Sequence, residues 1–226
     1  MGNAKYWYRT AMNNRTLVKA CLSLLVSLAA SGASASGLDA LEAFVKSAKT
    51  GRAEFTQVVT SPPKDAQAAR SKTSTGTFEF SRPNRFKFVY VKPFAQTIVA
   101  DGQTLWMYDA DLNQVTARSQ AAALGATPAA LIASAADLKA LKADFNLATA
   151  PDKDGLEWVL ATPRAKDSAL QSVRVGMKGN DLAVLEILDS FGQRSVMTFT
   201  AMQSNAALEA AAFQFKPPVG ADVVRQ

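Results

Sequence analysis

The chain has 226 residues, of which 48% are hydrophobic and 19% charged, and its formal net charge is +6. It contains no histidine and a single cysteine, Cys21. Ser-His-Asp and Cys-His catalysis are therefore excluded, as are zinc or copper sites built on imidazole or thiolate ligands.

The first 35 residues have the pattern of a secretory signal peptide. A short apolar run at 20–30 is followed by the small residues Ala33-Ser34-Ala35, and it is preceded by four cations, Lys5, Arg9, Arg15 and Lys19. This apolar run is shorter than the roughly 20 residues that a membrane-spanning helix needs. We therefore expect a signal peptide cleaved after Ala35, in preference to a membrane anchor.

Removing residues 1–35 changes the charge balance. Four of the 25 Lys and Arg are lost, leaving 21 against 19 Asp and Glu, a net charge of +2 without a basic cluster. Basicity therefore does not favour nucleic-acid binding. Cys21 is lost as well, so no disulfide is expected. We expect residues 36–226 to form a single domain in a bacterial periplasm, with a core large enough to be stable alone.

The exported part begins with an amphipathic helix at 38–49, where apolar residues recur at helical spacing: Leu38, Leu41, Phe44, Val45 and Ala48. A strand is predicted at 53–60. The polar segment 61–74 contains Pro62-Pro63, which indicates an exposed loop or the end of a long hairpin.

Four strands are predicted next, at 76–82, 85–91, 96–101 and 104–109, and a fifth at 113–118. Their breaks include Pro83-Asn84 and the hairpin signal Asp101-Gly102. Five aromatic residues of this region are core residues by default, but they could instead line an apolar cavity: Phe78, Phe80, Phe86, Phe88 and Trp106.

Arg82 lies between Phe78 and Phe80 on one side and Phe86 and Phe88 on the other. One interpretation is an ordinary surface arginine at a strand end. The other is a cation at the mouth of an apolar cavity, whose fork of donors binds the carbonyl groups of whatever closes the cavity.

Residues 120–143 are rich in Ala and Leu and predict one or two helices. Thr127-Pro128 is a helix start, with Leu131 and Ile132 as apolar contacts, and Asp137 could begin a second helix. Strands are then predicted at 144–149, 155–162, 169–177, 181–189, 194–203 and 212–216. Without β-α-β alternation, about eleven strands and two or three helices indicate a mostly β fold: one curled antiparallel sheet whose concave face the helices cover.

The sequence offers no site for a metal or cofactor. There is no glycine-rich phosphate loop. The carboxylate pairs Asp109/Asp111 and Asp152/Asp154 fall at predicted turns, and neither completes a calcium-binding loop. We expect no catalytic residue, metal or cofactor.

Five motifs in order, over about 38–222, resemble the LolA family of periplasmic outer-membrane lipoprotein carriers. They are Phe55-Thr56-Gln57, Arg82-Pro83-Asn84-Arg85-Phe86, the segment DGQTLWMY at 101–108, TPAALIA at 127–133 and FQFKPPVG at 213–220. The resemblance implies a half-open β-barrel of about eleven strands with helices as a lid, in a chain that is a monomer and not an enzyme.

The resemblance also implies roles for individual residues. Arg82 is the latch that holds the lid shut over an empty cavity. The acyl chains of a lipoprotein would lie against Phe78, Phe86, Phe88, Trp106, Leu131 and Ile132, and the lid helices would include Leu41, Val45, Thr127 and Pro128. Ala129-Ala130 departs from the bulkier residues of relatives, and a slacker lid contact could follow.

The implied partners are acylated lipoproteins, an inner-membrane lipoprotein-releasing ABC transporter and an outer-membrane receptor of similar fold. That receptor is itself lipid-anchored, so the absence of a cysteine after the signal peptide favours the carrier. Two alternatives stay open: a periplasmic module that senses lipids or lipoproteins and regulates a membrane protease, and a carrier of glycolipid or another specialised cargo. An enzyme acting on lipid is disfavoured by the absence of His and Cys.

Overall fold

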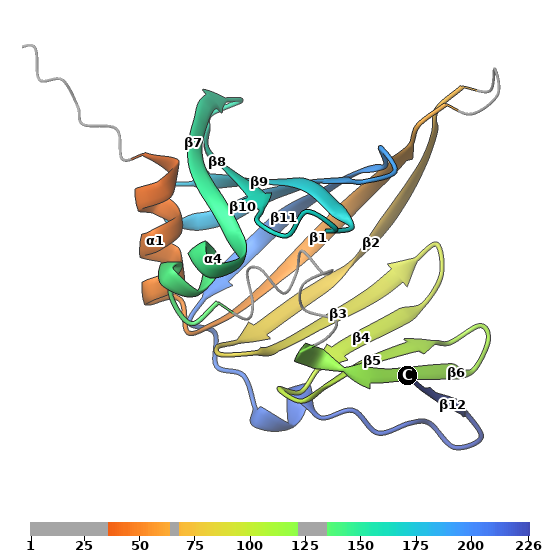
Figure 1. Ribbon diagram of the computed structural model, residues 1–226. Helices are drawn as coiled ribbons and strands as arrows, with labels where there is room; N and C mark the ends of the chain where they lie inside the picture. Colours follow the sequence, from red (N-terminus) through yellow and green to blue (C-terminus); the bar gives the residue numbers. More distant parts are fainter. Residues whose placement is uncertain (1–35, 64–67, 122–134) are drawn as a thin grey trace, which may run out of the picture. The chain divides into compact units, whose positions relative to one another are not determined.

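The computed structural model describes residues 36–63, 68–121 and 135–226, and residues 35–226 form one compact unit. Within the described residues, twelve strands make one sheet in the order β12-β6-β5-β4-β3-β2-β1-β11-β10-β9-β8-β7. Every pairing is antiparallel except that of β12 with β6. The sheet is open and strongly curved, so the mostly β fold with a curled antiparallel sheet is confirmed (Figure 1).

The strands follow the sequence with short turns between most of them. Their bounds are β1 (Thr50–Ser61), β2 (Arg70–Ser81), β3 (Arg85–Lys92), β4 (Gln96–Ala100), β5 (Thr104–Asp109), β6 (Gln114–Ser119), β7 (Phe145–Lys153), β8 (Leu156–Pro163), β9 (Leu170–Lys178), β10 (Asp181–Asp189), β11 (Arg194–Ser204) and β12 (Asp222–Arg225).

Helix α1 (Gly37–Ser47) begins at a capping box, in which Ser36 accepts a hydrogen bond from the backbone N–H of Asp39 and the Asp39 carboxylate accepts one from the backbone N–H of Ser36. Its apolar stripe is buried and includes Leu41, Phe44 and Val45. The helix packs against β7, β8, β9 and β10. The helix predicted at 38–49 is therefore confirmed, and it covers part of the concave face (Figure 1).

Helix α4 (Leu138–Asp144) starts where Asp137 was predicted to cap it. The Asp137 carboxylate accepts a hydrogen bond of 2.8 Å from the backbone N–H of Ala140. Leu138 and Leu141 are buried beside α1. Thr127, Pro128, Leu131 and Ile132 lie outside the described residues. In the parts of the chain that are described, no helix is long and apolar enough to cross a membrane.

The structure settles one open alternative and corrects one prediction. Of the two interpretations of 61–74, an exposed loop or the end of a long hairpin, it shows the hairpin: β1 runs to Ser61, β2 starts at Arg70, and these two residues pair. The strand predicted at 212–216 is absent; a short 3-10 helix, η1 (Ala210–Phe213), and an extended tail stand there instead. The strand after this tail is β12, which was not predicted.

The C-terminal tail covers the outer face of β3 to β6. Phe213 is buried, and the Phe215 ring lies 5.5 Å from that of Trp106. Asn113 donates a hydrogen bond to the carbonyl oxygen of Gly220, which ties the tail to the β5–β6 turn. The sheet therefore has two apolar layers: the main core on its concave face, and a smaller one under the tail.

Candidate functional site

Arg82 comes directly after β2 and lies where two covering segments meet. Its Nε donates a hydrogen bond of 2.9 Å to the carbonyl oxygen of Ala48, the residue that ends α1. Its Nη1 donates one of 2.9 Å to the carbonyl oxygen of Ala135, just before α4. One side chain therefore joins the sheet, the end of α1 and the approach to α4.

The Arg82 guanidinium is buried among aromatic rings. Its Cζ lies 5.3 Å from the ring centre of Phe44 and 5.0 Å from that of Phe80, and only 9% of the residue is exposed. Burial lowers the pKa of Arg82 to about 10, so the side chain remains a cation at neutral pH. The rings and the C-terminal end of α1 both favour a positive charge at this point.

The phenylalanines that flank Arg82 in sequence form a stack on the concave face. Phe78, Phe80, Phe86 and Phe88 are between 0% and 3% exposed. The Phe78 and Phe88 rings are stacked with centroids 4.5 Å apart. Leu41 and Val45 of α1 belong to the same core. In this structure the predicted cavity residues of β2 and β3 are therefore brought together in one closed core with residues of α1.

Trp106 is not part of this core. Phe86 is opposite Ala100 in the β3–β4 pair, and Ala100 is opposite Leu105 in the β4–β5 pair, so Leu105 faces inward and Trp106 faces outward. Trp106 packs against Phe215 and the guanidinium of Arg225 instead. Placing Trp106 in one cavity with Phe86 was therefore wrong, because adjacent residues of a strand point to opposite faces.

On the concave face, the inward residues of β3, β4 and β5 change from apolar to polar at aligned positions. No single stretch of the sequence indicates that these changes align. On neighbouring strands, Phe78, Phe88, Ile98 and Met107 form one cross-strand row. The next inward positions on β3, β4 and β5 are the directly paired Tyr90, Gln96 and Asp109. The signal was present in the alternate residues of each strand, but only the register shows that the changes align.

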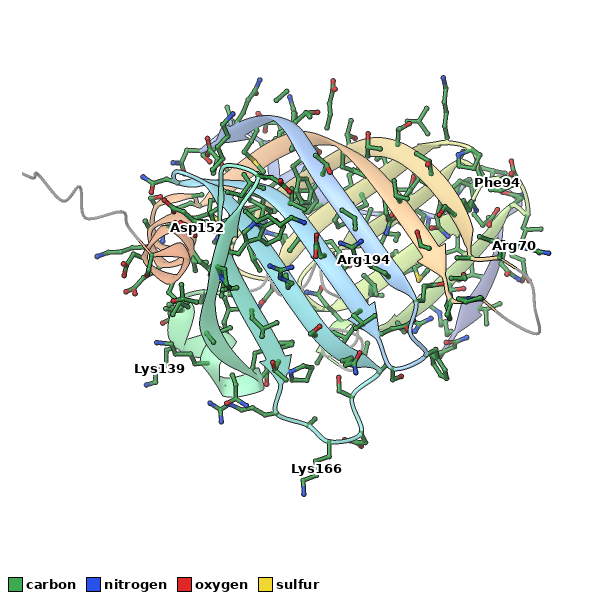
Figure 2. All side chains as sticks on the ribbon, turned by 90° about the horizontal axis from the view of Figure 1, so that it is seen from above. Arg70, Phe94, Lys139, Asp152, Lys166 and Arg194 are labelled. Atoms are coloured by element: carbon green, nitrogen blue, oxygen red, sulfur yellow. The ribbon has the colours of Figure 1, made fainter. Side chains whose placement is uncertain are left out.

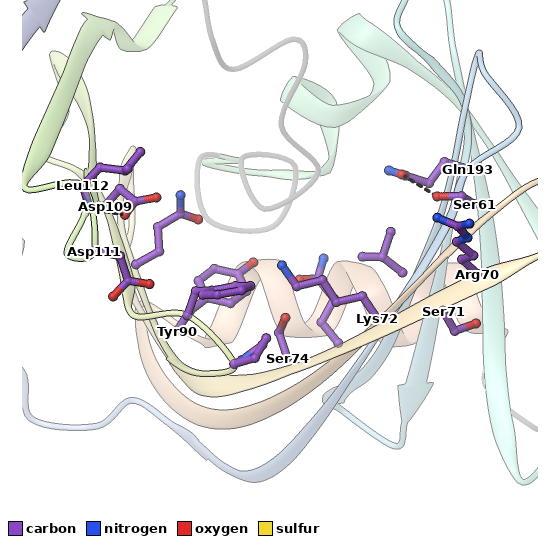
Figure 3. Close-up of a pocket in the computed structure, with 15 residues that line it drawn as sticks. Ser61, Arg70, Ser71, Lys72, Ser74, Tyr90, Asp109, Asp111, Leu112 and Gln193 are labelled. Carbon is purple, nitrogen blue, oxygen red and sulfur yellow. Dashed lines mark hydrogen bonds between the residues drawn. The ribbon is translucent and has the colours of Figure 1, made fainter.

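Beyond that boundary lies an open pocket of about 720 Å³ (Figure 3). Tyr90 and Ser74 form its floor, with Asp109 and Leu112 on one side and Arg70 and Gln193 on the other. Arg70 and Phe94 mark the end of the sheet at which it opens, away from α1 (Figure 2).

Gln120 is a second buried polar side chain that the sequence did not indicate. It is 2% exposed, its Nε2 donates a hydrogen bond of 2.6 Å to the carbonyl oxygen of Asn84, and its Oε1 accepts one of 2.9 Å from Gly102. Gln120 thus fixes the turn immediately after Arg82.

Of the two carboxylate pairs predicted at turns, Asp109 has a structural role. Asp109 accepts a hydrogen bond from the backbone N–H of Leu112 in the β5–β6 turn, as its predicted turn position implied. Over the described ranges, no group of three or more His, Cys, Asp or Glu side chains is placed to hold a metal ion.

Residues 46–216 match the model of the family described as outer membrane lipoprotein carrier protein LolA. The outer-membrane lipoprotein carrier protein of Albidiferax ferrireducens is 65% identical over 210 residues, covering 91% of this chain and 97% of the relative. That of Methylibium petroleiphilum is 53% identical over 199 residues, covering 88% and 94%. Among solved structures, this chain is similar to a LolA superfamily protein from Nitrosomonas europaea. The match covers 80% of this chain and 99% of that protein, with a TM-score of 0.45 and 11% identity.

Proposed function

The chain belongs to the LolA family of outer membrane lipoprotein carrier proteins, and on that premise we propose how its residues hold and release cargo. It is a periplasmic carrier of outer-membrane lipoproteins and not an enzyme. The family inferred from the five sequence motifs is thereby confirmed. The regions that we propose to act in transport are the concave face of the sheet and the latch residue Arg82.

The acyl chains of the cargo occupy the concave face where Phe78, Phe86 and Phe88 now form a closed core. Burying one methylene contributes about 0.8 kcal/mol, so ten methylenes approach 8 kcal/mol before costs are subtracted. Because these rings are at most 3% exposed, an acyl chain must open the core that they share with residues of α1, including Leu41 and Val45. The exchange of one apolar partner for another lowers the net affinity and keeps loading reversible.

Arg82 is the latch of the empty carrier. The observation that carries this proposal is that its guanidinium binds both Ala48 and Ala135. These bonds stabilise only the closed arrangement, so cargo must break them to enter and their return favours release. By family resemblance alone, Thr127 and Pro128 would begin a further lid helix, and Leu131 and Ile132 would contact the acyl chains.

The partners are proposed from the family and from the chemistry of the chain. The sequence has no glycine-rich phosphate loop, so the energy for loading comes from elsewhere. An inner-membrane ABC transporter would supply it, and an outer-membrane receptor of similar fold would receive the cargo. The carrier acts as a monomer after residues 1–35 have been removed as a signal peptide.

A photo-crosslinking residue at position 86 tests the acyl-chain site in living cells. We expect Phe86→benzoylphenylalanine to capture lipoproteins, while the same residue at Thr77, which is exposed on the opposite face of β2, captures none. Capture of a glycolipid would indicate a specialised carrier, and capture of a membrane-anchored regulator would indicate a sensor. Equal capture at both positions would contradict the proposed site.

A further inference from the structure

We propose that the pocket beyond Tyr90 binds the stretch of polypeptide next to the acylated residue of the cargo. The proposal rests on the function proposed above, in which the acyl chains lie on the phenylalanines of the same sheet face. It assigns an extended peptide, rather than a further acyl chain, to the 720 Å³ pocket.

The inward-facing residues of β3, β4 and β5 change from apolar to polar at the same level, and those of β1 and β2 do so one inward position later. Phe55 on β1 is joined to Tyr90 through Gly76, and the next inward position on β1 is Gln57, which is opposite Ser74 on β2. On β3, β4 and β5, the row Tyr90–Gln96–Asp109 comes directly after Phe88–Ile98–Met107. A ligand that lies along this face meets an apolar surface and then a polar one, which is the order of an acyl group and the peptide attached to it.

The pocket wall has the chemistry that a peptide backbone needs. An extended peptide presents one N–H donor and one carbonyl acceptor per residue, and both need partners when water is removed. The wall offers side chains that can do both, the amides Gln57, Gln96 and Gln193 and the hydroxyls Ser61, Ser71 and Ser74. A hydrocarbon chain uses none of these groups and would leave them without water.

Tyr90 joins the two regions. Its ring lies 5.0 Å from that of Phe55 and 6.3 Å from that of Phe88, so its face belongs to the aromatic stack. The same residue lines the pocket. Tyr90 therefore stands where an acyl chain ends and a polar chain begins.

The pocket lies on the side of the phenylalanines away from Arg82, at the end of the sheet that is open to solvent. Ser74 lies eight residues before Arg82, which corresponds to about 26 Å along the strand. The rim is formed by turn residues, among them Phe94, which is 57% exposed, and Leu112, which is 70% exposed. Lys72 lies over the Phe94 ring at 4.5 Å. Because this end of the sheet is open, the rest of a cargo protein can remain in solvent while its first residues are held.

Photo-crosslinking of the loaded carrier tests the assignment. Benzoylphenylalanine is placed at Ser74, at its outward neighbour Thr73 and at Phe88, and the captured part of a purified lipoprotein is identified by mass spectrometry. We expect position 74 to label the residues next to the acylated one, position 88 to label the acyl chains and position 73 to label neither. Labelling of acyl chains alone at position 74 would overturn the peptide assignment and leave the proposed function intact. Loss of labelling at position 88 would instead overturn the proposed function.

Binding of two synthetic ligands provides a second test. One is a dipalmitoylated cysteine with a blocked carboxyl group, and the other carries a hexapeptide after the same cysteine. We expect the peptide to tighten binding about tenfold, the effect of one or two net hydrogen bonds. In the double variant Ser74→Leu/Gln96→Leu that gain should fall to within about twofold, with the blocked ligand bound as in the parent and Thr73→Leu as control. An undiminished gain in the double variant, with its fold intact by circular dichroism, would contradict the assignment.

Discussion

Nη1 of Arg82 donates a hydrogen bond of 2.9 Å to the carbonyl oxygen of Ala135, 53 positions later in the chain. Nε of the same side chain binds Ala48, so both groups depend on one residue of the sheet. Ala135 lies two residues before Asp137, the cap of α4, and Ala48 is the C-terminal cap of α1. A change at Arg82 therefore acts on both covering helices at once.

Replacing Arg82 with leucine should leave loading intact and slow the transfer of cargo. A hydrogen bond from a charged donor contributes about 1.5–3 kcal/mol, so losing two weakens the closed state by about 3 kcal/mol or more. That corresponds to a roughly 100-fold loss in the tendency to close over an empty face and expel cargo. The measurement is the rate at which loaded Arg82→Leu carrier passes lipoprotein to a purified receptor.

Arg85→Leu is the matched control, since Arg85 begins β3 directly after the same turn but its guanidinium lies over Phe213 on the outer face. It should transfer cargo at the parent rate. Parent-like transfer by Arg82→Leu would refute the latch.

Introducing a charge at Phe86 should abolish loading. Phe86 is 0% exposed in the apolar core. A glutamate side chain there costs several kcal/mol, either as an unpaired carboxylate or, after it takes up a proton, as a buried carboxyl group without a hydrogen-bond partner. Phe86→Glu should fail to support growth as the only copy, whereas Lys87→Glu, on the opposite face of β3, should support it.

Misfolding could produce the same growth defect at position 86. Phe86→Leu keeps an apolar side chain and should fold, with a loss of about 1–3 kcal/mol in the free energy of unfolding and slower loading. Normal lipoprotein release by both Phe86 variants would count against the acyl-chain site.

Local sequence patterns predicted most of the fold. The period of α1, the capping Asp137 and the hairpin at Asp101-Gly102 are signals within a few residues, and each element stands where it was predicted. The open or wrong predictions concern segments whose structure depends on distant partners. Residues 70–74 are polar, so the sequence left a loop and a hairpin end as alternatives; they form strand because β1 pairs with them as far as Ser61. β12 forms by lying parallel to β6, which no local pattern reports.

The candidate site likewise contains residues that local sequence predicted and residues whose positions depend on distant partners. Arg82 and the phenylalanines stand out in the sequence because they are adjacent there. Trp106 was misplaced because its face depends on the register of β4 and β5, and Gln120 carried no local signal, because its partners Asn84 and Gly102 lie in other turns.

Removing the Gln120 amide should disturb the turn after Arg82. Gln120→Leu leaves the carbonyl oxygen of Asn84 and the N–H of Gly102 without this partner, which costs about 1–3 kcal/mol for each group that stays buried. We expect a lower melting temperature and a slower transfer of cargo. The neighbouring Ala121, which is exposed, supplies the control Ala121→Leu. A stability loss with unchanged transfer would mean that Gln120 supports the fold without positioning Arg82.

Asp101 should make the stability of the β4–β5 hairpin depend on pH. Burial alone would raise the pKa of Asp101, but hydrogen bonds from the N–H groups of Thr104, Trp106 and Gln103 outweigh it, and the pKa lies below the usual 3.8. A carboxyl group whose pKa is lowered by folding contributes stability above its unfolded pKa, and that contribution is lost as the pH falls through its folded pKa. Asp101→Asn should therefore be less stable than the parent at pH 7, and the difference should shrink below pH 3.8. Urea unfolding at several pH values measures it, with the exposed Asp167→Asn as control. A difference that is constant across the acid range would show that the Asp101 charge contributes nothing to the hairpin.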